Sequence, residues 1–252
     1  YKRQILMAAS LASGKSTLKN CAIEPEVIDL INFLNKCGAL IKVKNRTITV
    51  RGVEELKLQD YKVIPDRIEA GSYILATMAT KGRLKLNNFN PKDLALPLKL
   101  YKGMGLKIKK LSNSSYEIYC KTLKPIKKIS TKEFPGYPTD LQAQLIATQL
   151  KSGLKSKVVE NIFENRFIHI PELRRFGANL SIKGKTVTID KTSNLLGAEV
   201  MATDIRASFS LIIAAMMSKG KTVINRIYHL DRGYEDFDLK LKKCGVNISR
   251  KK

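Results

Sequence analysis

The sequence predicts an α/β protein made of four copies of one helix–strand–helix–strand–strand unit. Two observations lead to this fold class. An apolar segment with helical spacing, a glycine and a short strand-like segment follow one another four times along the chain. A second glycine then follows each of the first ones, again between a helical and an alternating segment. Recurrence at a steady period indicates a repeated structural unit.

The first helix of each unit ends at one of four glycines, which lie about 70 residues apart. They are Gly14, Gly82, Gly153 and Gly220. A glycine is expected there because the chain turns through a left-handed conformation at the end of a helix. The first of these turns contains "SGKST", which resembles half of a phosphate-binding loop, but Ala9 stands where that loop needs its first glycine. We therefore expect a helix end and a strand at residues 13–17, and no nucleotide site.

The second helix of each unit ends at another glycine, about 24 residues beyond the first. These glycines are Gly38, Gly105, Gly177 and Gly245. Each is predicted to close an amphipathic helix and to open a strand. Segments such as "RTITVRG" and "KTVTIDK" alternate with period two and predict the third strand of the unit.

The composition favours a cytoplasmic protein, which we expect to be a monomer. No apolar run is long enough to span a membrane. The four cysteines (Cys21, Cys37, Cys120 and Cys244) show neither metal-ligand spacing nor the density of a disulfide-rich protein. Two of them, Cys37 and Cys244, directly precede repeat glycines, and we expect them to be small core residues. A reducing compartment follows from this use of cysteine.

The formal net charge of +24 raises the question of nucleic acid as a partner. Most of the basic residues are lysines scattered over predicted helix faces and turns, without aromatic residues interleaved for base stacking. We interpret most of this charge as a solvated surface. Binding of a polyanion such as RNA stays open as an alternative.

Three aspartates stand where long helices are predicted to begin: Asp66, Asp140 and Asp204. Each could cap its helix, which stabilises by about 1 kcal/mol. Asp140 differs because the proline-rich approach "FPGYPTD" fixes the backbone more rigidly than a cap requires. A carboxylate held in this way suits a hydrogen bond to a sugar hydroxyl.

Arginines gather in the joins between the units. They are Arg67, Arg166, Arg206 and Arg232. The planar fork of arginine matches phosphate or carboxylate, so convergent arginines and aspartates predict a site for an anionic substrate with hydroxyl groups. The alternative is a set of salt bridges between repeats. His169 and His229 are candidates for catalysis, although a hydrogen-bonded structural histidine is the favoured interpretation of both.

Several long motifs resemble one known family. "EPEVIDLINFLNKCGA", "PDRIEAGSYI", "PTDLQAQ", "FENRFIHIPEL", "ATDIRAS" and "RIYHLDRGYE" are similar, in order, to the UDP-N-acetylglucosamine 1-carboxyvinyltransferases, the enolpyruvyl transferases of peptidoglycan synthesis. The resemblance runs from about residue 5 to the end of the chain. The sister family, the 5-enolpyruvylshikimate-3-phosphate synthases, shares the fold but not these motifs.

This resemblance implies an inverse α/β prism, in which six units form two domains with helices inside and sheets outside. Four of the six units are present. Residues 1–64 would be the last unit of the first domain, and residues 65–252 would be the second domain with three units. The active site of the family lies in the cleft between the domains.

The resemblance also implies a reaction that needs no metal or cofactor. The enolpyruvyl group of phosphoenolpyruvate is joined to the 3-hydroxyl of UDP-N-acetylglucosamine, and phosphate is released. Asp140 would bind the 3-hydroxyl and act as the base, Arg232 would hold phosphoenolpyruvate, and Asp204 would lie beside the reacting centre. The remaining residues expected to bind substrate are Ile162 (by its backbone), Glu164, Arg166, Arg206, Asp66 and Glu24.

Departures from the family pattern lead us to expect a fragment that is inactive alone. The family's mobile loop with a Cys or Asp and an Arg, and its Lys-Asn pair, have no match in this chain, and Ile23 replaces a usual basic residue. We expect the natural sequence to continue upstream, with residues 1–4 foreign to it. An unpaired sheet edge would make the fragment poorly stable. An inactive paralogue on the same scaffold is a further alternative, although Asp140 and Arg232 are both present.

Overall fold

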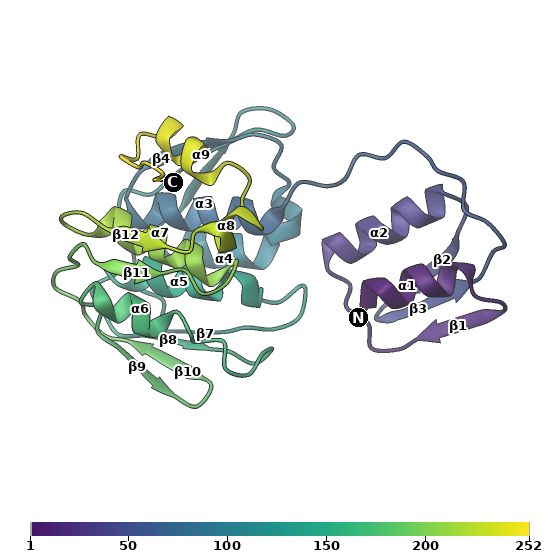
Figure 1. The fold of residues 1–252 in the computed structure, drawn as a ribbon, viewed down its shortest axis with the longest axis horizontal. Helices are drawn as coiled ribbons and strands as arrows, with labels where there is room; N and C mark the ends of the chain where they lie inside the picture. Colours follow the sequence, from purple (N-terminus) through teal and green to yellow (C-terminus); the bar gives the residue numbers. More distant parts are fainter. Residues whose placement is uncertain (1, 252) are drawn as a thin grey trace. The chain divides into compact units, whose positions relative to one another are not determined.

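The structure is a computed structural model that describes residues 2–251, and the chain forms two compact units (Figure 1). The first unit extends to Pro65 and includes Glu133–Pro135. The second unit contains Asp66–Lys132 and the chain from Gly136 onwards. Of the residues expected to be foreign, Tyr1 lies outside the described residues, and the next three form part of the first helix.

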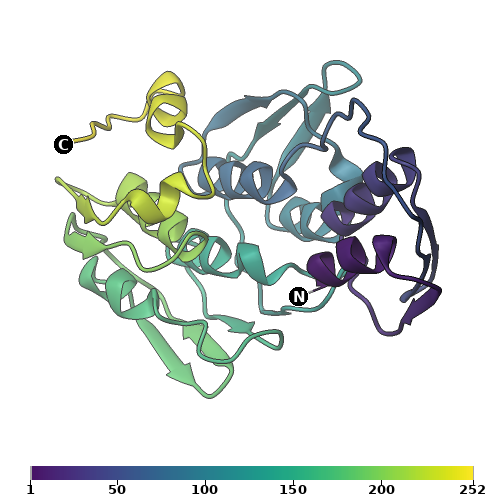
Figure 2. The same cartoon turned by 45° about the vertical axis from the view of Figure 1, so that its right-hand side comes forward.

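The first unit packs two helices on one face of a three-stranded antiparallel sheet (Figures 1 and 2). Its elements are α1 (Lys2–Leu11), β1 (Lys15–Leu18), α2 (Pro25–Lys36), β2 (Leu40–Lys44) and β3 (Thr47–Arg51). The strands lie in the order β1-β3-β2, so the third strand of the unit is the central one. Ile41, Ile48 and Val50 form the buried face of the sheet, in agreement with the predicted alternation.

The turn at "SGKST" has the predicted structure. Helix α1 ends at Leu11, Gly14 has φ of +87°, and β1 begins at Lys15. The segment is therefore a helix end and a strand start. The corresponding turn of the second copy differs by one residue. Lys81 (φ +54°), and not Gly82, takes the left-handed conformation there.

The second unit contains the other three copies of the repeat. Its helices are α3 (Arg67–Ala79), α4 (Ala95–Gly103), α5 (Gln142–Gln149), α6 (Ile170–Arg175), α7 (Ala207–Met217), α8 (Tyr228–Asp231) and α9 (Phe237–Lys243). Its strands are β4 (Arg83–Leu86), β5 (Lys107–Lys110), β6 (Tyr116–Tyr119), β7 (Lys128–Ser130), β8 (Ser156–Val159), β9 (Leu180–Lys183), β10 (Thr186–Ile189), β11 (Glu199–Met201) and β12 (Val223–Asn225). The short 3-10 helices η1 (Pro91–Leu94) and η2 (Thr139–Leu141) precede α4 and α5.

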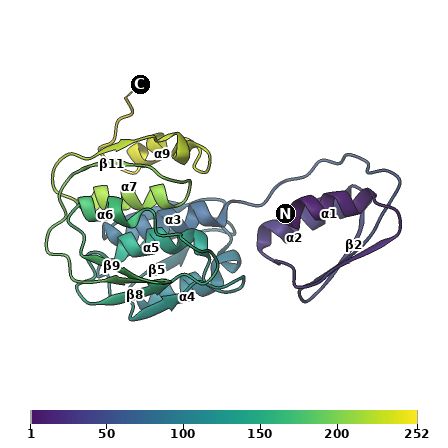
Figure 3. The ribbon, with the colours of Figure 1, turned by 60° about the horizontal axis from the view of Figure 1, so that its bottom comes forward.

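Helices α3, α5 and α7 pack against one another at the centre of the second unit, with the strands outside them (Figures 1 and 3). Every residue of α5 is buried, as expected of a helix enclosed on all sides. The outer sheets have the orders β4-β6-β5 and β7-β8-β10-β9, and β11 pairs with β12. This arrangement confirms the predicted fold class of helices inside and sheets outside.

Two predictions about the last copy of the repeat are wrong for the described residues. No strand follows Gly245 in the part of the chain up to residue 251. In the other copies the second strand pairs with the central third strand, and no third strand follows here among the described residues. A strand there would lack hydrogen-bond partners. Cys244, expected in the core, is exposed at this end of α9.

Candidate active site

Two of the three predicted aspartates cap the helices that they precede. Asp66 is the N-cap of α3, where its Oδ1 accepts hydrogen bonds from the N–H groups of Ile68 (2.7 Å) and Glu69 (3.1 Å). Asp204 accepts from the N–H groups of Arg206 (2.8 Å) and Ala207 (2.7 Å) at the start of α7. The capping interpretation is therefore correct for both, and it leaves Oδ2 of Asp66 free for a second contact.

Asp140 lies in η2, before α5, and is held by an arginine. Arg166 donates from Nη2 to Oδ1 of Asp140 (2.6 Å) and from Nη1 to the hydroxyl of Thr139 (2.7 Å). The side chain of Asp140 is 40% exposed, and that of Arg166 is 22% exposed. Oδ2 of Asp140 has no hydrogen bond to any residue between 2 and 251. The pair thus presents one oxygen of a fixed carboxylate to solvent.

Arg206 joins two copies of the repeat. Its Nη2 lies 3.2 Å from Oδ2 of Asp66, its Nη1 donates to the carbonyl oxygen of Gly233 (3.4 Å), and its guanidinium lies over the ring of Tyr234. Burial disfavours the charged form, but Tyr234, Asp66 and Asp140 together outweigh burial and raise the pKa of the guanidinium. The salt bridge between repeats that we considered for Arg206 is present.

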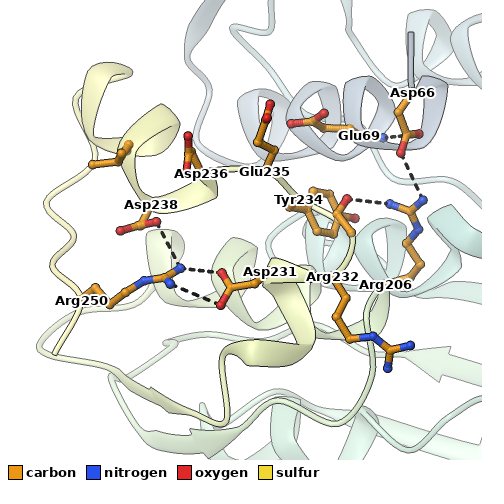
Figure 4. A pocket seen from close by; sticks show the side chains of 12 residues that line it. Asp66, Glu69, Arg206, Asp231, Arg232, Tyr234, Glu235, Asp236, Asp238 and Arg250 are labelled. Atoms are coloured by element: carbon orange, nitrogen blue, oxygen red, sulfur yellow. Dashed lines mark hydrogen bonds and ion pairs between the residues drawn. The ribbon is translucent and has the colours of Figure 1, made fainter. Parts of the chain in front are cut away.

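A pocket of about 790 Å³ opens beside this arginine in the second unit (Figure 4). Three predicted site residues line it: Asp66, Arg206 and Arg232. Arg232 follows α8, and its exposed side chain forms no ion pair or hydrogen bond with the described residues. An unpaired guanidinium in an open pocket can bind a mobile anion.

The far side of the pocket is acidic and is fixed by the C-terminal segment. Arg250 pairs with Asp231 (2.6 Å) and with Asp238 (3.2 Å). The hydrogen bond to Asp231 raises the pKa of Arg250, burial opposes this increase, and the charges of Asp231 and Asp238 add to it. Arg250 was not predicted, since nothing in "ISRKK" distinguishes this arginine from its basic neighbours.

The remaining predicted residues lie in different surroundings. The N–H of Ile162 donates to Oε1 of Glu160 (2.8 Å), and Glu164 is exposed. Glu24 belongs to the first unit, where it precedes α2, and its Oε2 is buried without a hydrogen bond to a described residue. Arg67 is buried at the start of α3.

Neither histidine is the hydrogen-bonded structural residue that we expected. His169 is fully buried, and neither ring nitrogen has a partner within residues 2–251. Burial, assisted by the charge of Arg166, lowers the pKa of His169 to about 3. The ring of His229 instead packs against that of Tyr228, with centroids 4.2 Å apart. A neutral, enclosed imidazole such as His169 is a packing residue.

Sequence reasoning missed a buried polar network beneath Arg206. The hydroxyl groups of Ser72 and Tyr234 lie 2.8 Å apart, and Nε2 of Gln144 donates to both, at 3.2 Å and 3.1 Å. All three residues occur in motifs that we quoted, but no local pattern shows that a serine, a glutamine and a tyrosine from three different segments meet in the core. The network fixes the ring against which Arg206 lies.

The part of the chain that the structure describes shows no helix able to cross a membrane and no group of three or more His, Cys, Asp or Glu residues placed to hold a metal ion. The candidate site offers carboxylates, guanidinium groups and backbone amides.

Comparison with known proteins identifies relatives over nearly the whole chain. The EPSP synthase (3-phosphoshikimate 1-carboxyvinyltransferase) family matches residues 1–241. The UDP-N-acetylglucosamine 1-carboxyvinyltransferase of Pelagibacter ubique (strain HTCC1062) is 50% identical over 98% of this chain and 59% of the relative. The enzyme of the same name from Koribacter versatilis (strain Ellin345) is 45% identical, over 98% of this chain and 57% of the relative.

Solved structures give the same class of protein. The enolpyruvyl transferase NikO from Streptomyces tendae superposes with a TM-score of 0.85 at 26% identity, over 97% of this chain and 58% of that one. An EPSP synthase from Acinetobacter baumannii, at 16% identity, shares the fold with a TM-score of 0.72 over 98% of this chain and 60% of that one. The fold is that of the enolpyruvyl transferases. The chain belongs to the EPSP synthase family, and it spans 57% to 59% of the length of the two curated relatives named above.

Proposed function

We propose that this chain carries part of the active site of a cytoplasmic enzyme that transfers the enolpyruvyl group of phosphoenolpyruvate to the 3-hydroxyl of UDP-N-acetylglucosamine. The observation that carries the proposal is the Asp140–Arg166 pair, with Oδ2 of the aspartate unoccupied by any described residue. The names of the relatives with 50% and 45% identity support the sugar nucleotide as acceptor. Buried free thiols at Cys21, Cys37 and Cys120 support a reducing compartment.

Asp140 is assigned to the acceptor hydroxyl. A fixed carboxylate oxygen can accept the hydrogen of an alcohol and can take its proton as the alcohol oxygen attacks. Arg166 holds the other oxygen at 2.6 Å, so the carboxylate does not have to be ordered when the sugar binds. Ile162 contributes backbone contacts to the sugar nucleotide, and Glu164 and Arg166 support this side of the site.

Arg232 and Asp204 are assigned to the enolpyruvyl donor. Arg232 binds the carboxylate or phosphate of phosphoenolpyruvate, because its guanidinium is exposed in the pocket and makes no ion pair with a described residue. Asp204 lies two residues before Arg206 and is the acid beside the reacting centre. Arg206, Asp66 and Glu24 complete the set of proposed substrate-binding residues.

The reaction is an addition followed by an elimination. The 3-hydroxyl oxygen of the sugar bonds to C2 of phosphoenolpyruvate while C3 gains a proton, which gives a tetrahedral intermediate. Loss of a proton from C3 and departure of phosphate then form the enol ether. Charge develops on the phosphate as it leaves, and fixed guanidinium groups such as Arg206 stabilise it.

The test is calorimetric titration of this chain with UDP-N-acetylglucosamine, with Asp140→Asn as the variant. We expect saturable binding that is at least about tenfold weaker in the variant, since the amide cannot take the place of the charged acceptor. Lys157→Gln, an exposed change on β8, is the control and should bind as the parent does. Equal binding of UDP and the sugar nucleotide, or tighter salt-dependent binding of RNA, would contradict the proposal.

A further inference from the structure

Glu160 is a buried acid whose carboxylate accepts four hydrogen bonds. The residue directly follows β8 and is 1% exposed. Its Oε1 accepts from the hydroxyl of Thr131 (2.8 Å) and from the N–H groups of Ile162 (2.8 Å) and Phe163 (3.1 Å). Its Oε2 accepts from the hydroxyl of Thr139 (2.7 Å). A carboxylate removed from water is costly unless its oxygens are all hydrogen-bonded, as they are here.

The contact with Thr139 determines the direction of a hydroxyl group in the site. Glu160 can only accept from Thr139, so the threonine must donate its single proton to Oε2. The lone pairs of the same hydroxyl are then left for Nη1 of Arg166, at 2.7 Å. This geometry turns Nη2 of Arg166 toward Asp140. Glu160 thus acts on the carboxylate of Asp140 through Thr139 and Arg166.

The same carboxylate also holds the backbone next to the proposed sugar contact. Its bonds to the N–H groups of Ile162 and Phe163 close the turn after β8. One side chain therefore connects the segment that contains Asp140 with the segment that contains Ile162 and Arg166. These segments are separate in sequence, and the hydrogen bonds hold them together.

We propose that Glu160 is the positioning residue of the acceptor half of the site. It orients the hydroxyl of Thr139, keeps Arg166 bound to Asp140, and so sets the position of the carboxylate that meets the sugar. The inference takes its substrate, UDP-N-acetylglucosamine, from the proposed function. The contacts from which it is argued are all between residues of this chain.

Glu160→Gln keeps the shape of the side chain but removes its ability to orient the hydroxyl of Thr139. The amide oxygen must take the place of Oε1, because that atom accepts two backbone N–H groups. The amide nitrogen then faces Thr139, whose proton loses its acceptor, and the bond to Arg166 is disturbed. Thr139→Val removes the relay with little change of shape, and Thr139→Ser keeps the hydroxyl. Glu172→Gln is the matched control, since Glu172 also accepts a backbone N–H, from Met201 at 2.8 Å.

The first measurement needs no ligand. In the parent, the two bonds of Arg166 should slow rotation of its guanidinium, so that the Nη1 and Nη2 signals stay separate in nuclear magnetic resonance spectra. We expect these signals to merge in Glu160→Gln and Thr139→Val, and to stay separate in Thr139→Ser and Glu172→Gln. If Glu160→Gln and Thr139→Val lower the stability of the chain but their Nη1 and Nη2 signals stay separate, the inference is overturned.

The second measurement is the affinity of the same variants for UDP-N-acetylglucosamine. Glu160→Gln and Thr139→Val should each bind at least about tenfold more weakly, and the double variant no more weakly than the worse single variant, because both act through one chain of contacts. Additive losses, or parental affinity in Thr139→Val, would contradict the inference. If the parent does not bind the sugar nucleotide, the proposed function fails, and the guanidinium signals still decide the role of Glu160.

Discussion

His169 shows how a single buried group can couple stability to pH. Its imidazole is fully enclosed, and neither nitrogen has a hydrogen-bond partner among residues 2–251. Burial and then the nearby charge of Arg166 lower its pKa from 6.5 to about 3. Between about pH 3 and pH 6.5, the ring is therefore neutral in the native state but protonated in the unfolded chain.

We predict that the free energy of unfolding falls as the pH is lowered from 7 toward 5. Between the two pKa values the unfolded state binds a proton that the native state does not, so stability rises with pH there. The effect approaches about 1.4 kcal/mol per pH unit below 6.5. Urea unfolding at pH 7 and pH 5 measures it, and His169→Phe should reduce the difference. An equal difference in parent and variant would show that other groups cause it.

The residue scale also marks where sequence reasoning about the site succeeds and where it ends. The motifs predict that aspartates stand at helix starts, and Asp66 and Asp204 do cap their helices. The sequence does not predict that Arg166 contacts Asp140, because the two residues lie on different segments. Glu160 was missed for the same reason, since a lone glutamate after a strand normally indicates a solvated surface. The functional roles of these residues stay predictions.

At the scale of elements, one helical glycine controls the packing of α3 against η2. A Cβ atom on Gly71 would lie 2.6 Å from Cδ1 and 3.0 Å from Cδ2 of Leu141. Leu141 is fully buried, so its side chain has no empty space into which to move. Since Leu141 follows Asp140 directly in η2, this close approach also holds the segment that carries Asp140 against α3.

We expect Gly71→Ala to destabilise the chain by about 1–2 kcal/mol, because overpacking exceeds the gain in helix propensity. Gly103→Ala is the matched control. Gly103 is also helical, in α4, but a Cβ atom there would meet nothing within 4 Å. That substitution should be neutral or slightly stabilising. Urea midpoints measured by tyrosine fluorescence compare the two, and a stable Gly71→Ala chain would show that Leu141 can move.

The repeat explains how far the fold could be predicted from sequence. Alternation locates β1 and β3 because every second residue of these strands is less exposed than its neighbours, and the apolar run locates α3 because most of its residues are buried. The pattern fails at residues 246–250, where a strand requires a central neighbour that no local pattern can supply. Local sequence also could not show that β7 joins β8 in parallel, since this pairing depends on distant residues.

At the scale of the whole molecule, the dominant electrostatic feature is an excess of positive charge. The chain has 46 Lys and Arg residues against 22 Asp and Glu, a net charge of +24. On the sheet β4-β6-β5, one row across the strands places Arg83 and Lys107 on either side of Tyr119. The next row on the same face places Lys85 and Lys109 on either side of Glu117, the one acid in the two rows, which pairs with Arg83 at 3.2 Å. Such like charges repel one another in the folded state more than in an expanded chain.

We therefore predict that the melting temperature rises when sodium chloride is increased from 0.01 M to 0.1 M, as the Debye length shrinks from about 30 Å to about 10 Å. Lys107→Glu, which places an acid across Tyr119 from Arg83, should raise the melting temperature at low salt and weaken its dependence on salt. Lys107→Gln should have roughly half that effect, because it removes a repulsion without adding an attraction. Calorimetry at the two salt concentrations makes the comparison. A melting temperature that falls with salt would mean that ion pairs such as Arg166–Asp140 and Arg206–Asp66 stabilise the chain more than its net charge destabilises it.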